Sequence, residues 1–156
     1  MNEITIPNYA ALQLEHIVLD YNGTIAKEGI LKESAKKLIN KLSENYTVHI
    51  ITADTFGSVA AQSEELDIVL KILTTSDHTQ EKADYVESLG CEYCAAIGNG
   101  NNDAKMLQKA ALGIAIVEDE GCATSTLLVA DIVCKTIEDA LELFLYPKRL
   151  MATLRR

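Results

Sequence analysis

Acidic, hydroxyl and amine side chains stand just after apolar segments of the chain. Asp20 begins the loop 20–24, Thr52 follows a second apolar segment, Lys82 lies further on, and a loop of glycine and asparagine ends at Asp103. A carboxylate can attack an electrophile, a hydroxyl and an ammonium can hold anionic oxygens, and an oxygen-rich loop can bind a hard cation. Together these residue types indicate chemistry on an anionic group such as phosphate.

Each of these residues also has a purely structural interpretation. Asp20 and Asp103 are residue types that cap helices and tight turns, and the glycines of both loops suit turns. Thr52 could bond the backbone at a strand edge, and Lys82 could be a solvated helix residue. Taken singly, the structural interpretation is the commoner one. The conjunction of all four in one order favours a functional site.

Alternating apolar and amphipathic segments predict the elements that must position these residues. The pattern is typical of an α/β fold with a Rossmann-like, doubly wound parallel sheet in a three-layer α/β/α arrangement. An N-terminal β-hairpin is expected to precede it, through 4–6 and 12–14. The strands are expected at 17–19, 47–51, 68–72, 94–97, 113–117 and 131–133, and the covering helices at 31–42, 83–89, 106–110 and 137–145.

In such a sheet the ligand lies at the carboxyl ends of the strands, next to helix N-termini. The residues that follow each strand should therefore meet at one edge. Lys82 is placed in the first turn of its helix, where its charge opposes the helix dipole and suggests a nearby anion. Asp54 is expected to cap a helix that begins near Thr55.

Length and charge limit the other possibilities. The 156 residues fit one domain, 1–156, and no linker or repeat divides them. The net charge of -9 disfavours nucleic acid and anionic membranes as partners. The longest apolar run, 110–117, is too short to span a bilayer, and the N-terminus carries no secretory pattern, so a cytoplasmic location is expected.

The four cysteines predict neither a disulfide framework nor a zinc ribbon. A reducing compartment disfavours disulfides, and Cys122 and Cys134 are too far apart to complete a zinc site with Cys91 and Cys94. Cys94 opens an apolar stretch typical of a buried strand, so a structural role is favoured for this pair. The three histidines are likewise interpreted as packed or capping residues.

The order of the motifs resembles that of the haloacid dehalogenase superfamily. Within it, the stretches 82–86, 98–104 and 113–116 resemble the phosphorylation domain of P-type ATPases, and the likeness extends over about residues 16 to 145. The chain looks like a member of the small group labelled soluble P-type ATPases. This resemblance implies a capless, magnesium-dependent phosphoryl-transfer hydrolase acting on a small phosphorylated substrate.

The resemblance also implies roles for individual residues. Asp20 would be the nucleophile that forms an aspartyl phosphate, with Thr52 and Lys82 holding the phosphoryl oxygens. The substrate would be bound by Asn22, Gly23, Ala53 and Asn102, with the backbone amides near Asn22 and Gly23 directed at the phosphate. Mg²⁺ would be held by Asp20, the carbonyl of Asn22, Asn99 and Asp103.

Two positions depart from the phosphatase pattern. Asn22 stands where hydrolytic members carry an acid/base aspartate, and an amide cannot deliver that proton. Alkoxide leaving groups should therefore depart slowly, which favours acyl phosphates and anhydrides as substrates. Asn99 replaces an acidic residue of the metal loop, and this lowers the expected affinity for Mg²⁺.

The spacing between motifs excludes an inserted domain. The gaps from Thr24 to Ile50 and from Thr52 to Lys82 hold only a helix and a strand or flap. Without a nucleotide-binding domain or a Walker loop, ATP recognition has no visible basis. Open sites of this kind are commonly completed by a homo-oligomer or by a macromolecular substrate.

Two functions remain open on the sequence. One is a catalyst working through Asp20. The other is a phosphate- or metal-binding regulatory module with little turnover, which Asn22 and Asn99 would favour.

Overall fold

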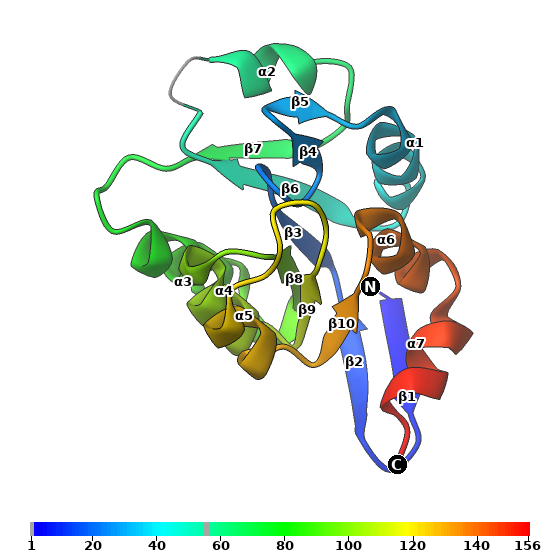
Figure 1. Ribbon diagram of the computed structural model, residues 1–156. Helices are drawn as coiled ribbons and strands as arrows, with labels where there is room; N and C mark the ends of the chain where they lie inside the picture. Colours follow the sequence, from blue (N-terminus) through cyan, green and yellow to red (C-terminus); the bar gives the residue numbers. More distant parts are fainter. Residues whose placement is uncertain (1, 55–56) are drawn as a thin grey trace.

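The computed structural model describes residues 2–54 and 57–156, and a six-stranded sheet lies at its centre (Figure 1). All neighbouring strands are parallel, in the order β10-β9-β8-β3-β6-β7. This confirms the predicted Rossmann-like sheet. The strands are β3 (His16–Asp20), β6 (Thr47–Thr52), β7 (Val69–Ile72), β8 (Cys94–Gly98), β9 (Leu112–Ile116) and β10 (Ile132–Cys134).

Helices cover both faces of the sheet, as a three-layer arrangement requires (Figure 1). On one face lie α1 (Glu33–Leu42) and α6 (Ile137–Leu145), which contact each other. On the other lie α3 (His78–Leu89), α4 (Ala104–Lys109) and α5 (Thr124–Val129). Strand β3 serves both layers, because alternate side chains of a strand point to opposite faces.

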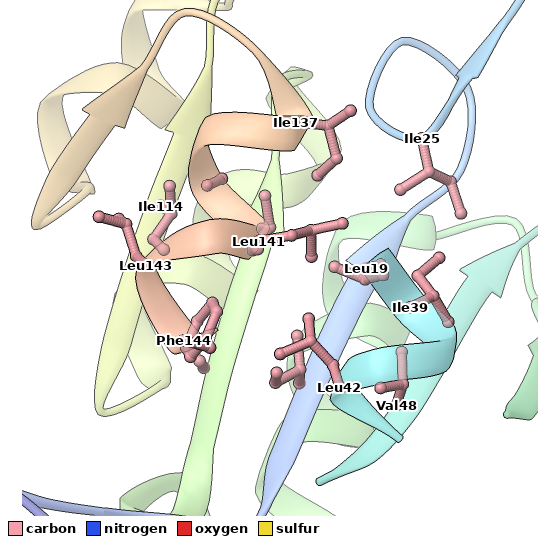
Figure 2. Close-up of a cluster of buried hydrophobic side chains, with 14 of the residues drawn as sticks. Leu19, Ile25, Ile39, Leu42, Val48, Ile114, Ile137, Leu141, Leu143 and Phe144 are labelled. Atoms are coloured by element: carbon pink, nitrogen blue, oxygen red, sulfur yellow. The ribbon is translucent and has the colours of Figure 1, made fainter. Parts of the chain in front are cut away.

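A large cluster of buried hydrophobic side chains fills the core between the sheet and α1/α6 (Figure 2). Leu19 of β3 meets Ile39 of α1 and Leu141 of α6, and all three are fully buried. Val18, the next residue along β3, packs into the opposite layer with Val86 of α3. The apolar stripe predicted for 31–42 therefore faces the sheet, while its lysines point outward.

The N-terminal hairpin stands apart from the main sheet. Strand β1 (Asn2–Ile6) pairs antiparallel with β2 (Ala10–Leu14), which confirms the predicted hairpin, and Ile4 lies opposite Leu12. A further helix, α7 (Pro147–Leu154), lies beside β1 (Figure 1). The sequence predicted that the helix at 137–145 ends before Pro147, with no further helix after it. The proline instead begins this new helix at its first position, where a missing N–H costs nothing.

A second small hairpin follows β3. It consists of β4 (Ala26–Lys27) and β5 (Ile30–Leu31), and Gln62 of α2 (Ser58–Gln62) holds it. The Gln62 amide accepts from the Leu31 N–H at 2.7 Å and donates to the Gly29 carbonyl at 2.8 Å. The helix start predicted near Thr55 lies outside the described residues. The N-cap residue of α2 is Gly57, not Asp54, although the Asp54 carboxylate accepts from Val59 N and Ala60 N in the first turn of this helix.

Two short 3-10 turns, η1 (Cys91–Tyr93) and η2 (Asn101–Asp103), flank β8. The four cysteines are free, and Cys94 is buried at the start of β8, where burial raises the pKa of its thiol to about 12. Within the described ranges, no helix is both long and apolar enough to cross a membrane.

Candidate active site

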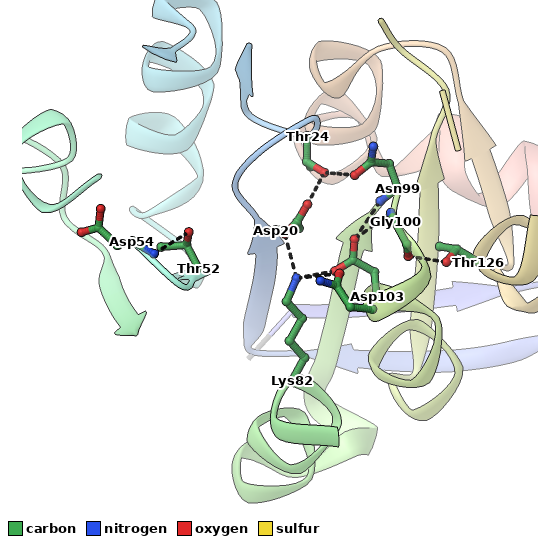
Figure 3. A network of polar contacts seen from close by, with 10 residues as sticks. Asp20, Thr24, Thr52, Asp54, Lys82, Asn99, Gly100, Asp103 and Thr126 are labelled. Atoms are coloured by element: carbon green, nitrogen blue, oxygen red, sulfur yellow. Dashed lines mark hydrogen bonds and ion pairs between the residues drawn. The ribbon is translucent and has the colours of Figure 1, made fainter. Parts of the chain in front are cut away.

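Lys82 bridges two carboxylates at the carboxyl end of the central strands (Figure 3). Its Nζ lies 2.8 Å from Asp20 Oδ1 and 2.7 Å from Asp103 Oδ1. It also donates to Asn102 Oδ1 at 3.2 Å. The exposed fractions of Lys82, Asp20 and Asp103 are 2%, 8% and 0%. Three charged groups this deeply buried are rare unless they are paired, as these are.

Neighbouring elements bring these residues together as the sequence predicted. Asp20 is the last residue of β3, and Asp103 ends η2 directly after β8, the strand beside β3. Gly98, at the end of β8, makes room for the Asp103 carboxyl group. A Cβ on this glycine would lie 2.5 Å from Asp103 Cγ. Asp103 Oδ2 then accepts from the backbone N–H groups of Asn99 and Gly100, each at 3.0 Å.

Lys82 reaches the site from a different helical position than predicted. Helix α3 begins at His78, because the Asp77 side chain accepts from Gln80 N and caps the helix there. Lys82 is therefore the fifth residue of the helix rather than a residue of its first turn. The two carboxylates, not the helix dipole, account for its position.

Two carboxylates, Asp20 and Asp103, surround the single ammonium group of Lys82, and these charges shift the pKa values of Asp20 and Lys82. Burial and the neighbouring Asp103 charge raise the pKa of Asp20 to about 7, although Lys82 and Thr24 oppose this shift. Burial alone would lower the pKa of Lys82, but the Asp20 and Asp103 carboxylates outweigh it, so the pKa lies above its ordinary value. The site therefore holds more negative than positive charge when both acids are ionised.

This excess of negative charge fits a divalent cation. Asp20 and Asp103 offer hard carboxylate oxygens of the kind that Mg²⁺ prefers, and both converge on the position of one cationic group, Lys82 Nζ. Asp20 and Asp103 are the two carboxylates that contact Lys82, and the described residues hold no group of three or more His, Cys, Asp or Glu that could bind a metal ion. Backbone carbonyls, amides or phosphate oxygens would have to complete the shell.

Other predicted residues line a cavity of about 790 Å³ that opens above Asp20 and Lys82. Thr52 and Ala53 come from the end of β6, beside β3, and Asn22 and Asn102 come from the two loops. Thr52 is buried, and its hydroxyl oxygen accepts from Asp54 N at 3.3 Å. Its proton has no acceptor among the described residues, so it can serve a ligand. In Figure 3, Thr52 lies on the opposite side of Asp20 from Asn99.

Gly23 does not present its amide as predicted. Its N–H donates to the Ala26 carbonyl at 3.0 Å, which closes the turn after Asp20. Its role lies in its backbone conformation, with φ at +77°, and in the absence of a side chain. A Cβ at Gly23 would lie 2.6 Å from Glu120 Oε2 and 2.7 Å from Asn99 Nδ2.

Asn99 lines the cavity, but its amide group is engaged elsewhere. Its Nδ2 donates to the Gly121 carbonyl at 3.2 Å, and its Oδ1 lies 3.5 Å from the Thr24 hydroxyl. Asn99 therefore ties the metal loop to the turn after β9. Its amide oxygen, the atom that could bind Mg²⁺, makes this long contact with Thr24 and keeps a second lone pair for a cation.

Some side chains of the site were missed by sequence reasoning. The Thr24 hydroxyl donates to Asp20 Oδ2 at 3.1 Å, while His78, Glu28 and Glu120 line the cavity. Glu120 follows β9, so the strand-end rule applied to the fifth strand would have found it. His78 had been interpreted only as a helix-start residue, and Glu28 lies in a hairpin with no periodic signal.

Sequence comparison finds relatives for parts of the chain, and no family model matches it. Sixty residues are 55% identical to an uncharacterised protein of Methanocaldococcus jannaschii, covering 38% of this chain and 64% of that protein. Another protein of that organism is 46% identical over 39 residues, which are 25% of this chain and 89% of the relative. A probable copper-exporting P-type ATPase of Archaeoglobus fulgidus is 40% identical over 96 residues, 60% of this chain but 12% of the ATPase.

Solved structures match the fold over nearly the whole chain. A 3-deoxy-D-manno-octulosonate 8-phosphate phosphatase from Moraxella catarrhalis superposes with a TM-score of 0.72 at 20% identity, covering 92% of this chain and 94% of that one. The corresponding phosphatase from Haemophilus influenzae gives 0.74 at 13% identity, covering 92% and 94%. A putative haloacid dehalogenase superfamily hydrolase from Legionella pneumophila gives 0.73 at 17% identity, covering 91% and 87%.

The structural matches establish the fold, and the P-type ATPase segment agrees with the resemblance seen in the motifs. The chain therefore has the fold of these haloacid dehalogenase superfamily structures and shares a segment of sequence with a P-type ATPase.

Proposed function

We propose that the protein is a magnesium-dependent phosphoryl-transfer hydrolase that acts through a phospho-aspartate on Asp20. One observation carries the proposal: Asp20 and Lys82 line an open cavity, and Lys82 Nζ lies within hydrogen-bond distance of both Asp20 and the buried Asp103. A carboxylate nucleophile, a buried ammonium and a second acid are the parts that phosphoryl transfer requires.

The reaction has two displacements. In the first, an Asp20 carboxylate oxygen attacks phosphorus, a P–O bond to Asp20 forms, and the bond to the leaving group breaks. In the second, water attacks the same phosphorus, the bond to Asp20 breaks, and phosphate and the free carboxylate are released. Lys82 and Thr52 hold the phosphoryl oxygens in both steps, and Thr24 orients Asp20 through its 3.1 Å hydrogen bond.

Mg²⁺ bound by Asp20 and Asp103, with the Asn22 carbonyl, would neutralise charge between the carboxylates and the phosphate. The structurally similar Moraxella phosphatase was crystallised with magnesium and phosphate, which supports this cofactor. Asn102 and Ala53 line the cavity and are assigned to substrate contact. Asn99 is assigned to the metal loop, and the Thr24 and Gly121 contacts of its amide make it the weakest member of the ligand set.

The substrate is proposed to be a small phosphorylated compound. The cavity is large enough for one, and the similar structures include phosphatases of a sugar phosphate. Because Asn22 cannot protonate an alkoxide, acyl phosphates and anhydrides are favoured over simple esters.

Asp20→Asn tests the proposal directly. With Mg²⁺ and acetyl phosphate or p-nitrophenyl phosphate, the native protein should release phosphate and the variant should lose at least ~10³ of that rate, because an amide does not replace the nucleophile. Asp67→Asn, at an exposed position outside the cavity, is the matched control and should retain activity. Turnover that survives Asp20→Asn would rule the mechanism out.

Asn22→Asp tests the interpretation of the missing acid. Restoring a carboxyl group at this position should raise the hydrolysis rate of alkyl phosphates by about 100-fold, the lower end of the range of general acid–base catalysis. Acetyl phosphate hydrolysis should change less, since its leaving group needs little protonation. An unchanged ratio of the two rates would mean that position 22 does not face the leaving group.

The alternative is a phosphate- or metal-binding regulatory module. It is favoured by Asn99, which supplies a neutral amide in place of an acid in the metal loop and whose NH₂ group is held by the Gly121 carbonyl. Calorimetric binding of phosphate and Mg²⁺ without turnover of any phosphate ester or acyl phosphate would support this function instead.

A further inference from the structure

The outer part of the active-site cavity carries three carboxylates. Glu28 comes from the turn between β4 and β5, Asp54 follows β6, and Glu120 lies in the turn after β9. These residues are far apart in the sequence and enter the cavity from three separate segments. The cavity wall beyond the Asp20–Lys82 pair is therefore acidic on several sides.

Two of the three carboxylates have no partner within the described residues. The Asp54 carboxylate accepts from backbone N–H groups of α2. Glu28 and Glu120 are exposed, and no hydrogen bond or ion pair links either side chain to another residue described by the structure. Glu120 Oε2 nevertheless lies against the nucleophile loop, 2.6 Å from where a Gly23 Cβ would be.

The nearby lysines do not balance these charges. Lys27 Nζ lies 2.7 Å from Asp119 Oδ2, and Lys32 Nζ lies 2.5 Å from Glu118 Oε1. Each lysine is thus neutralised by a neighbour of Glu120 in the same turn. Lys82 is committed to Asp20 and Asp103, His78 provides an imidazole, and no arginine lines the described cavity.

From this charge pattern we infer that the substrate of the proposed reaction is a phosphate compound whose leaving portion carries a cationic group, such as an ammonium, with Glu28 and Glu120 as the residues that select it. Phosphate binds at the floor, where Lys82, Thr52 and the metal ligands lie. The leaving portion extends past the two free carboxylates. A second anion there, such as a carboxylate, would be repelled by both.

The size of the preference follows from simple electrostatics. Opposite unit charges about 4 Å apart gain roughly 1 kcal/mol in bulk water, which is about fivefold in a binding constant. With two carboxylates, the cationic and anionic ligands should differ by at least tenfold. Added salt should shrink the difference, because the carboxylates are exposed.

The test uses three six-carbon sugar phosphates whose non-phosphate part is cationic, neutral or anionic: glucosamine 6-phosphate, glucose 6-phosphate and the open-chain 6-phosphogluconate. Binding to the Asp20→Asn protein with Mg²⁺ is measured by calorimetry, so that no ligand is consumed. The inhibition constants against p-nitrophenyl phosphate turnover by the native protein provide a second measurement. We expect the affinity to be highest for the ammonium compound, lower for the neutral one and lowest for the carboxylate. The first and last affinities should differ by at least tenfold.

The double variant Glu28→Gln/Glu120→Gln should reduce this spread to less than about threefold. Its control is Glu44→Gln/Glu92→Gln, which makes the same change in net charge at exposed positions away from the cavity and should leave the spread intact. Equal affinities, the reverse order, no binding of any of the three, or a spread that survives the cavity variant would overturn the inference.

This inference rests on the proposed function, because the ligand is a substrate only if the proposed reaction occurs. The two proposals can nevertheless fail separately. Turnover of p-nitrophenyl phosphate with equal affinities would refute the charge preference alone. Selective binding of glucosamine 6-phosphate without turnover of any phosphate compound would refute the catalytic proposal and leave the preference as that of a binding site.

Discussion

Lys82 is the residue on which the charge balance of the site depends. It is 2% exposed and sits between two acids, and burial alone would lower its pKa. Its ammonium group stays charged because the attraction to the Asp20 and Asp103 carboxylates offsets the free energy lost when the group leaves water. Removing one member of a buried ionic set costs more than the set contributes, since the remaining charges are left unpaired.

Lys82→Met is therefore expected to lower the free energy of unfolding by about 3–5 kcal/mol in EDTA, because two buried carboxylates lose their cation. Mg²⁺ should restore part of this loss by taking the position between them. Urea unfolding with and without Mg²⁺ measures both effects. Lys105→Met is the control, since Lys105 is exposed and contacts only Gln80 through its amine. An equal loss with and without Mg²⁺ would contradict a metal at this place.

The end of strand β8 determines how Asp103 faces the site. Gly98 is its last residue, and the Asp103 carboxyl group occupies the space where a Cβ would be. The strand thus positions the carboxylate against Lys82 on one oxygen and against two backbone N–H groups on the other.

Gly98→Ala is expected to push Asp103 out of this position and weaken Mg²⁺ binding at least tenfold, with a parallel loss of phosphate release. The added methyl group would come within 2.5 Å of Asp103 Oδ2, and the carboxylate cannot move without losing its N–H partners. Calorimetric titration with Mg²⁺ gives the affinity. Gly100→Ala is the control, because a Cβ there meets its nearest neighbour at an ordinary 3.5 Å. Equal affinities in the two variants would show that Asp103 is not a metal ligand.

At the scale of the whole molecule, a chain of polar contacts inside the fold couples stability to pH. His16 of β3, His49 of β6 and Tyr85 of α3 are linked, with ring nitrogens of the two histidines 3.1 Å apart and His49 Nδ1 2.8 Å from the Tyr85 hydroxyl. His49 is buried, and burial, followed by the His16 ring, lowers its pKa from 6.5 to about 4.

The sign of the effect follows from proton uptake. Between pH 6.5 and 4 the unfolded chain binds a proton at His49 that the folded protein does not, so stability is present above pH 6.5 and is lost as the pH falls toward 4. The loss should reach about 3 kcal/mol, at roughly 1.4 kcal/mol per pKa unit. Urea unfolding across this range should give a shallower slope for His49→Gln than for the native protein. Identical slopes would contradict a shifted His49.

Much of the fold followed from local patterns. The strands at 47–51 and 94–97 were predicted nearly to the residue, because a buried parallel strand is a short apolar run bounded by polar residues. Helices α5 and α7 were not predicted. Helix α5 has six residues, too few for a clear periodic pattern, and the proline at the start of α7 was interpreted as the end of the preceding helix. The Lys82 position was misjudged because the cap at Asp77 lies earlier than the apolar stripe suggested.

The sequence by itself determined the sheet type and the residues that end its strands, because periodicity and strand-end chemistry are properties of neighbouring residues. These properties alone predict that Asp20, Thr52 and Asp103 lie at one edge of the sheet. Only the tertiary structure decided that Gly121 and Thr24 contact the Asn99 amide, and that Glu120 lies over the nucleophile loop. These contacts join segments brought together by the packing of separate loops, and no local pattern encodes them.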